Sequence, residues 1–337
     1  MNPFVVVQPK SHAQAAAVVG AGGSYKLPVL KAGGIDLLDH LKEGLVAPDA
    51  VVNLRGVAMS GPAVSRTPEG RVRIEAGATL AQIAADPIVL EAAPVLAQAA
   101  ASAATPAIRN VATAAGNLLQ RPRCWYYRHA QFPCLKKGGS TCFAVEGENA
   151  HHAIFGPGPC HIVHPSNLAP ALAILGGTVH LVGSKRSSLS VADLYHMPDK
   201  GILSEHELQP GEVITHLTFA PEAMSGFHAV KAKQSFDWPC AFACVSVRVE
   251  AGTIREAKAC AGAVAPVPWM LPRVADALRG VKVDEDAAIA KAASLAAEGA
   301  TPMRDNGHKV ALLVASVRRA TLRALGRERP AFREIHA

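Results

Sequence analysis

The chain has 337 residues, of which half are hydrophobic and 18% are charged, so we expect two or three folded domains rather than a disordered chain. The net charge of +7 comes from scattered basic residues without interleaved aromatic residues, which argues against nucleic-acid binding. No basic segment followed by an apolar core opens the chain, and no apolar stretch is long enough to cross a bilayer. We therefore expect no export signal of its own and no membrane span.

The first 55 residues show the alternation of strands and helices typical of a small α/β lobe. The expected elements are strands at 4–7, 25–31 and 51–54 and helices at 11–19 and 37–44. Ser11 is the expected N-cap of the first helix, and Gly44 is expected to end the second. The pair Gly33-Gly34 stands before the second helix, where two glycines let the backbone approach a phosphate closely.

The middle of the chain predicts further strands and helices around a cysteine-rich stretch. The expected elements are a strand at 71–76, helices at 79–85 and 89–104, a helix at 168–175, a strand at 178–182, a strand turning into a helix at 188–195 and a strand at 213–219. Pro106 is expected to end the second of these helices. Pro221 follows the last strand and marks an expected domain boundary.

The last third predicts an antiparallel sheet with a helical layer, which is an α+β arrangement. This part begins with the segment 228–233, and two long strands are expected at 240–250 and 253–264, followed by helices at about 270–279, 284–298 and 307–326. Ala251-Gly252 separates the two long strands as a hairpin turn.

Four of the seven cysteines lie in one Gly- and Pro-rich stretch, 109–171, at Cys124, Cys134, Cys142 and Cys160. Their clustering argues against a disulfide framework, and the absence of a CxxC pair disfavours a zinc ribbon or a redox motif. Widely spaced cysteines in a loop can still converge on an iron–sulfur cluster. The alternative is a set of buried thiols. The other three cysteines lie on apolar strands at 240–260, where packing is the expected role.

A second small-residue turn precedes these cysteines. Thr113 and Asn117 offer a hydroxyl and an amide beside the backbone of Ala115 and Gly116. Together with Gly33-Gly34, this turn would suit the pyrophosphate of a dinucleotide. The alternative is that both turns merely close loops, and the residues alone leave the choice open.

Two runs resemble a known family: KAGGIDLLDHLKEGLVAPDAVVNL at 31–54 and IRNVATAAGNLLQRPRCWYYR at 108–128. They resemble the FAD-binding subunits of the molybdenum hydroxylases, which include xanthine dehydrogenase, aldehyde oxidoreductase and carbon monoxide dehydrogenase. The likeness extends over nearly the whole chain. The four-cysteine loop is similar to that of the bacterial periplasmic aldehyde oxidoreductases, a branch in which such a loop binds an extra [4Fe-4S] cluster.

The resemblance implies an α+β protein with a two-lobed FAD-binding fold of the vanillyl-alcohol oxidase type, followed by an α+β flavoprotein C-terminal domain. The implied lobes are 1–55 and 56–222, the cysteine loop spans about 118–163, and the C-terminal domain spans 223–337.

The resemblance also implies the site residues. The residues expected to bind FAD are Leu30, Lys31, Ala32, Gly33, Gly34, Ile35, Asp36, Leu37, Thr113, Gly116, Asn117, Asn167, Ile214 and Lys231. The residues expected to bind the [4Fe-4S] cluster are Cys124, Cys134, Cys142 and Cys160.

The implied function is electron transfer within a heterotrimer. A large partner subunit would carry the molybdenum cofactor, a small partner would carry [2Fe-2S] centres, and this chain would pass electrons through FAD to an external acceptor. No catalytic residue is expected here. The implied compartment is the cytoplasm, or the periplasm by co-export with a partner subunit.

Three positions depart from the family pattern: Ile35 replaces a threonine, Ala115 a glycine and Asn167 an aspartate. Because a lost neutral hydrogen bond costs about 0.5–1.5 kcal/mol, these changes could weaken FAD binding. They motivate an alternative, a flavin-free structural or cluster-only scaffold in the same kind of complex. A free-standing flavin oxidase is a third hypothesis, which the chain disfavours because it has no evident substrate domain.

Overall fold

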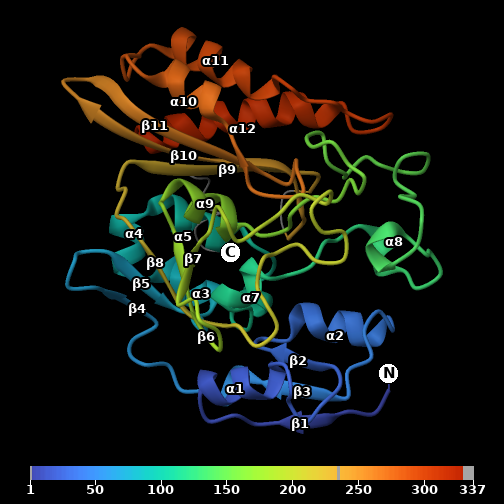
Figure 1. Cartoon of the computed structure of the whole chain (residues 1–337). Coiled ribbons are helices and arrows are strands. Elements are labelled where there is room, and N and C mark those ends of the chain that lie inside the picture. The colour runs from blue at the N-terminus through green and yellow to red at the C-terminus, as the bar shows by residue number, and fades with distance from the viewer. Residues whose placement is uncertain (1, 234–235, 329–337) are drawn as a thin grey trace.

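The computed structural model describes residues 2–233 and 236–328 and is arranged in three tiers (Figure 1). A small N-terminal lobe, a middle domain and a C-terminal sheet with its helices follow one another from bottom to top in that view. The last nine residues of the expected C-terminal domain, 329–337, lie outside the described residues. No helix in the described part of the chain is long and apolar enough to cross a membrane.

The N-terminal lobe is the α/β unit that the sequence predicts. Its parallel sheet has the order β1-β3-β2, and its elements are β1 Val5–Val7, α1 His12–Val19, β2 Pro28–Lys31, α2 Ile35–Lys42 and β3 Ala50–Asn53. Ser11 caps α1 by accepting a hydrogen bond from the Gln14 N–H at 3.2 Å. Gly44 follows α2 with φ of 68°, the left-handed conformation that ends helices. Both capping predictions are therefore confirmed.

The middle domain holds a five-stranded antiparallel sheet of order β4-β5-β8-β6-β7. Its strands are β4 Val64–Arg66, β5 Val72–Glu75, β6 Thr178–Val182, β7 Ser188–Ser190 and β8 Val213–Phe219. Its helices are α3 Leu80–Ala85, α4 Pro87–Ala92, α5 Pro94–Ser102, α6 Pro106–Arg109, α7 Ala114–Leu118 and α9 Leu168–Ile174. The short 3-10 helix η1, Leu54–Gly56, leads from the first lobe into this domain.

The structure corrects three expectations in the middle domain, two of them at prolines. The single helix expected at 89–104 is two helices, because Pro94 has no N–H to continue α4 and instead starts α5. Pro106 starts α6 rather than ending a helix, and the Thr105 hydroxyl caps it. The segment 188–195 contains β7 and a turn but no helix. Strand β4 was not expected.

The C-terminal domain is the predicted antiparallel sheet with a helical layer. The sheet order is β12-β11-β10-β9, with β9 Ser225–Lys231, β10 Pro239–Glu250, β11 Thr253–Gly262 and β12 Trp269–Met270. The helical elements are α10 Pro272–Leu278, α11 Asp286–Ser294, the 3-10 helix η3 Leu295–Ala297 and α12 His308–Ala324. Ala251 and Gly252 both have positive φ, as the short hairpin turn requires.

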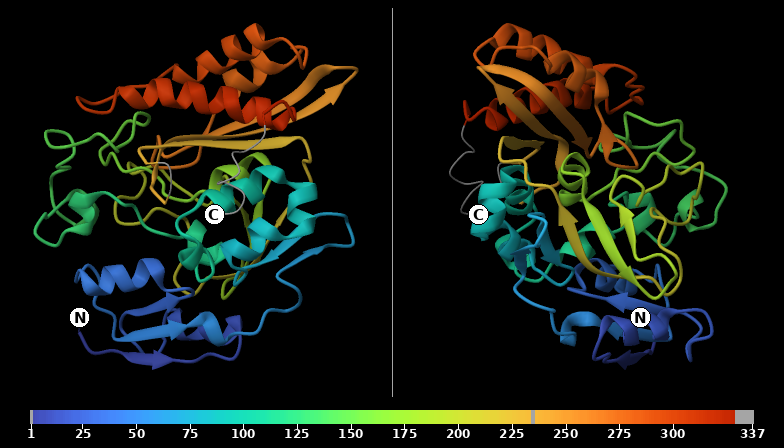
Figure 2. Two further views of the ribbon diagram at one scale, coloured as in Figure 1. Left: turned by 180° about the vertical axis from the view of Figure 1, so that it is seen from behind. Right: turned by 60° about the vertical axis from the view of Figure 1, so that its left-hand side comes forward.

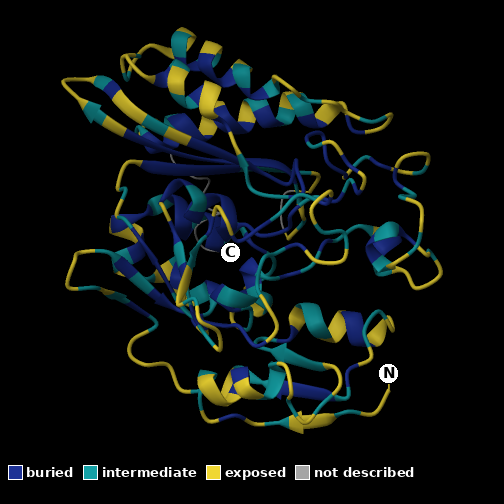
Figure 3. Cartoon of the chain, viewed as in Figure 1, coloured by how far each residue is buried: buried dark blue, intermediate teal, exposed yellow. Residues whose placement is uncertain are grey.

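The C-terminal sheet is buried between two layers of helices. Helix α12 packs on β9 and β10 from one side (Figure 2), while α5 and α9 of the middle domain contact the sheet from the other side. The strands between these layers are mostly buried (Figure 3), and Phe242 and Cys244 are fully buried there. This shared core joins the middle and C-terminal domains.

The cysteine-rich stretch forms a long irregular loop beside α2 and the C-terminal domain (Figure 1). Between α7 and α9 its only regular elements are α8, Trp125–Arg128, and the 3-10 helix η2, Leu135–Lys137. Ile154 and Phe155 at its far end are buried in the core of the C-terminal domain. The loop is therefore fixed at both ends by packed structure.

Candidate functional site

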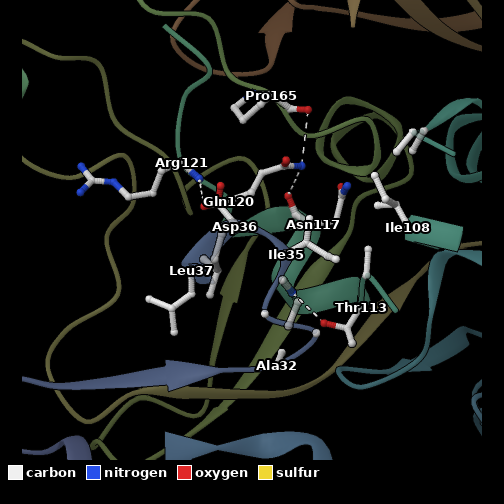
Figure 4. A pocket seen from close by; sticks show the side chains of 18 of the residues that line it. Ala32, Ile35, Asp36, Leu37, Ile108, Thr113, Asn117, Gln120, Arg121 and Pro165 are labelled. Carbon is white, nitrogen blue, oxygen red and sulfur yellow. Dashed lines mark hydrogen bonds between the residues drawn. The ribbon is translucent and has the colours of Figure 1, made fainter. Parts of the chain in front are cut away.

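A cavity of about 540 Å³ opens between the N-terminal lobe and the middle domain, and residues 236–239 of the C-terminal domain complete its wall. The labelled side chains of Ile35, Thr113 and Asn117 gather around it from two different turns (Figure 4). Its size falls within the range of pockets that bind small molecules and cofactors. The structure thus brings together two turns that lie about eighty residues apart in the sequence.

Thirteen of the fourteen predicted FAD residues line this cavity: Leu30, Lys31, Ala32, Gly33, Gly34, Ile35, Asp36, Leu37, Thr113, Gly116, Asn117, Asn167 and Ile214. The remaining one, Lys231, lies behind the wall, where its Nζ donates to the carbonyl of Ser102 at 2.7 Å. Ser102 itself lines the cavity. Which of these residues contact a flavin stays a prediction.

The Gly33-Gly34 turn offers open backbone donors. Gly34 has φ of 87°, and a Cβ on Gly33 would lie only 2.3 Å from the carbonyl oxygen of Val111. The next three N–H groups, at 35–37, open helix α2 and have no hydrogen-bond partner among the described residues. The positive end of a helix with free N–H groups is a site for an anion such as phosphate.

The second turn uses its backbone differently. The N–H groups of Ala114 and Ala115 donate to the carbonyls of Ala78 and Ala76, at 2.8 and 3.1 Å. The Gly116 N–H donates to the Thr113 hydroxyl at 3.2 Å. This turn therefore contributes side chains and shape to the cavity wall rather than open N–H groups.

The amide of Asn117 is oriented by its neighbours. Its Oδ1 accepts hydrogen bonds from the Ser166 hydroxyl at 2.6 Å and from the Leu168 N–H at 3.3 Å. Among the described residues nothing bonds its NH₂ group. A donor held in place at a cavity wall is well suited to a polar group of a ligand.

The three departures from the family pattern have distinct surroundings. Ile35 is 41% exposed, so its apolar side chain disturbs no core. Ala115 has its N–H already engaged, so a methyl group there blocks no open donor. The buried amide of Asn167 donates to the carbonyl of Ala99 at 3.4 Å, which an ionised aspartate could not do. None of the three closes the cavity.

Several residues that sequence reasoning missed surround Asp36. Its carboxylate accepts from the Arg121 N–H at 2.8 Å and the Arg128 guanidinium at 2.7 Å, and it also pairs with Arg123. The Arg123 guanidinium lies over the Trp238 ring, 4.8 Å from its centroid. The sequence feature that could have indicated these contacts is the presence of three arginines within eight residues, at 121–128. The bonds of these arginines to Asp36 connect the start of the cysteine loop to helix α2.

The four predicted ligand cysteines, Cys124, Cys134, Cys142 and Cys160, line one small pocket of their own. Backbone N–H groups point at three of the sulfurs: those of Tyr126 and Tyr127 at Cys124, those of Ala144 and His161 at Cys142, and that of Ile162 at Cys160. Such N–H donors stabilise thiolates. The four cysteines therefore lie together in the structure, and their role as cluster ligands stays a prediction.

The thiols of this pocket have perturbed pKa values. Burial raises the pKa of Cys124 to about 11. A hydrogen bond from the Cys160 thiol lowers the pKa of Cys142 to about 5, and the same bond raises the pKa of Cys160. In the described part of the chain, no three His, Cys, Asp or Glu side chains are arranged around a single metal ion.

The other three cysteines differ from this group. Cys244 on β10 stands opposite Cys260 on β11, and both are fully buried in the C-terminal sheet. Cys240 is also buried. Their positions agree with the packing role expected from the sequence.

Tyr127 stands between the two sites. It lines both the large cavity and the cysteine pocket, and it is buried. Its hydroxyl lies 3.1 Å from Nε2 of His40 on α2, and the Arg121 guanidinium covers its ring. The large cavity and the cysteine pocket therefore share one wall.

Family models account for nearly the whole chain. One described as the FAD-binding domain in molybdopterin dehydrogenase matches residues 2–220, and one described as the CO dehydrogenase flavoprotein C-terminal domain matches residues 225–326. The chain belongs to the family of FAD-binding subunits of the molybdenum hydroxylases. The predicted family, the order of an FAD-binding fold and a flavoprotein C-terminal domain, and the oxidoreductase class are confirmed.

Individual relatives support this family assignment and the fold. Over 247 residues the chain is 35% identical to the aldehyde oxidoreductase FAD-binding subunit PaoB of Escherichia coli (strain K12), covering 71% of this chain and 76% of PaoB. A chain of quinoline 2-oxidoreductase from Pseudomonas putida 86 has the same fold, with a TM-score of 0.73 at 23% identity over 96% of this chain and 98% of that one. A chain of carbon monoxide dehydrogenase from Oligotropha carboxidovorans gives a TM-score of 0.73 at 21% identity over 97% and 99%. The expected flavoprotein electron-transfer role stands over the flavin-free scaffold alternative.

Proposed function

We propose that FAD binds in the large cavity with its pyrophosphate at the start of α2. The observation that carries this proposal is the set of three N–H groups at 35–37, which have no hydrogen-bond partner among the described residues and belong to residues that line the cavity after a left-handed Gly34. Asn117 supplies a further fixed donor. The flavin supplies the redox chemistry when bound, and this chain positions it and excludes water from it.

The chain acts, in this proposal, as one subunit of an aldehyde-oxidising complex of the kind named for PaoB. A large partner with the molybdenum cofactor oxidises the substrate, and a small partner with [2Fe-2S] centres connects it to this subunit. This chain then passes electrons to an external acceptor. The compartment follows from the partners, either the cytoplasm or the periplasm by co-export.

The cysteine pocket is the proposed site of a [4Fe-4S] cluster, held by Cys124, Cys134, Cys142 and Cys160. The donor set fits: four sulfurs line one pocket, and backbone N–H groups point at three of them. A cluster of four irons takes one thiolate at each of four corners, so it does not need three side chains around a single ion.

Both cofactor proposals can be tested on the complex purified without oxygen. We expect acid to release a yellow flavin and iron analysis to give four irons per chain beyond those of the small partner. Cys134→Ser should lose these irons, since a hydroxyl binds iron–sulfur clusters poorly, while Cys260→Ser should keep them. Unchanged iron in Cys134→Ser would refute the ligand assignment. A complex without flavin would refute the FAD site.

A further inference from the structure

We propose that His152 is a positioning residue for the cluster ligand Cys124, and that its Nε2–H donates to the Cys124 sulfur and raises the reduction potential of the cluster. The inference rests on the proposed [4Fe-4S] site. It assigns a role to a residue outside the four-cysteine set.

The geometry of His152 is that of a buried residue aimed at a sulfur. Its Nε2 lies 3.2 Å from Sγ of Cys124, and the ring lines the cysteine pocket. The residue is only 4% exposed, and its ring packs edge-on against Trp125 with centroids 5.8 Å apart. The ring is therefore held beside one particular ligand.

The direction of this hydrogen bond follows from the chemistry of a ligand. A cysteine bound to iron is a thiolate, which accepts hydrogen bonds and donates none. The contact then requires the proton on Nε2, which leaves Nδ1 as a bare acceptor. Nδ1 of His152 is buried and has no hydrogen-bond partner among the described residues.

The C-terminal domain fixes the backbone of His152. Its carbonyl accepts from Nζ of Lys309 at 2.8 Å and from the amide of Asn306 at 3.3 Å, while its N–H donates to the carbonyl of Asn149 at 3.0 Å. Lys309 Nζ also holds the carbonyl of His151 at 3.3 Å. The main chain that carries the ring is thus held on both sides, while Trp125 packs against the ring itself.

A hydrogen bond to a ligand sulfur changes the reduction potential of the cluster, because reduction makes the cluster more negative. Reduction adds an electron that is partly carried by the ligand sulfurs, and an N–H donor stabilises the more negative state. Hydrogen bonds to the sulfurs are one of the factors that set cluster potentials, and the residues that orient ligands tune metal sites in the same way. Removal of the His152 donor should therefore shift the potential in the negative direction.

His151 provides a matched control. It is the adjacent residue on the same loop and also packs edge-on against Trp125, with ring centroids 5.9 Å apart. It is exposed, and among the described residues its ring makes no hydrogen bond to a cysteine. A change there alters the same segment without removing a donor to sulfur.

The test uses the whole complex and follows the cluster by paramagnetic resonance during a redox titration. His152→Phe, which keeps an aromatic ring but has no N–H, should retain iron and FAD and show a more negative cluster potential and an altered spectrum. His152→Gln should move the potential back toward the wild type, and His151→Phe should leave it unchanged.

An unchanged potential in an iron-replete His152→Phe complex would overturn the inference while leaving the cluster in place. Loss of iron from His152→Phe alone, with His152→Gln loaded at the wild-type potential, would support the need for a donor. Loss from both variants would show a merely structural side chain and would overturn the inference. Absence of iron from the wild-type complex would instead refute the proposed cluster, and the role of His152 with it.

Discussion

Gly33 is a residue at which the neighbouring backbone leaves no room for a side chain. A Cβ there would approach the carbonyl oxygen of Val111 to 2.3 Å, a contact between the two turns that frame the large cavity. A glycine at this place lets the two backbones touch. The sequence predicts that this glycine lets the backbone approach a phosphate, and the structure gives it a packing role as well.

Gly33→Ala should therefore displace the start of α2 from the turn at Val111. We expect a loss of about 1–3 kcal/mol in the free energy of unfolding, the usual cost of overpacking, together with weaker FAD binding. Denaturant unfolding and fluorescence titration with FAD measure the two effects. Gly61→Ala is the control, because nothing lies within 4 Å of a Cβ there. Equal behaviour of the two variants would contradict the prediction.

Glu212 makes the protein sensitive to acid. A hydrogen bond from Arg186 lowers the pKa of Glu212 from 4.5 to about 2, and the Ser184 hydroxyl and the Gln209 N–H also donate to it. Since the folded pKa is below the unfolded one, the stabilisation is complete above pH 4.5 and is lost as the pH falls toward 2.

Glu212→Gln should be less stable than the wild type at neutral pH and should lose less stability between pH 4.5 and 2. Urea unfolding at several pH values tests this. Glu256→Gln, which removes an exposed partner of Arg248, should change neither quantity measurably. Parallel pH profiles for wild type and Glu212→Gln would contradict the assignment.

Among the elements, α2 and α8 depend on each other. Arg128 of α8 donates to Asp36 of α2 at 2.7 Å, and His40 of α2 contacts Tyr127 of α8. The same helix α2 begins with residues 35–37, which line the cavity and whose N–H groups have no hydrogen-bond partner among the described residues. The cysteine loop therefore supports the helix start proposed to hold the pyrophosphate.

Arg128→Gln should weaken FAD binding although Arg128 does not line the cavity. A hydrogen bond to a charged group is worth about 1.5–3 kcal/mol, so the dissociation constant should rise by up to roughly ten- to a hundredfold. Arg66→Gln, which breaks an exposed pair with Glu91, is the control. Equal FAD affinity in both variants would show that the α2–α8 contact does not position the cofactor.

At the scale of the whole molecule, the cavity and the cysteine pocket share Tyr127, so occupancy of one site should affect the other. Cys134→Ser should therefore lower FAD affinity as well as iron content, whereas Cys260→Ser should lower neither. Coupling of binding free energies is reciprocal, so flavin-free protein should also bind the cluster more weakly. Titration of flavin-depleted complexes with FAD measures the effect. Wild-type affinity in Cys134→Ser would show that the sites are independent.

Periodicity and turn residues predicted most of the fold. The N-terminal lobe, the β10–β11 hairpin and α12 follow from local patterns: alternation, paired positive-φ residues and an amphipathic helix. The break at Pro94 was visible in the sequence but was masked by the alanine-rich run around it.

The site was predictable only in part. Loop residues 30–37 and the four cysteines came from family motifs and do line their cavities. The bonds of Asp36 to Arg121 and Arg128 join positions 85 and 92 residues apart, which no local pattern encodes. The engaged N–H groups of Ala114 and Ala115 depend on the end of β5 in the same way.

The hydrogen bonds between the C-terminal domain and the cysteine loop also affect when the loop can fold during synthesis of the chain. Lys309 holds His152 across 157 residues of chain, and the Thr301 N–H holds the carbonyl of Ile154. A ribosome releases all four cysteines long before it reaches these residues. The nascent loop therefore lacks its hydrogen-bond partners in the C-terminal domain until translation is almost finished. We expect iron delivery to be a late, post-translational event, and truncation before Asn306 to leave the thiols exposed to oxidation.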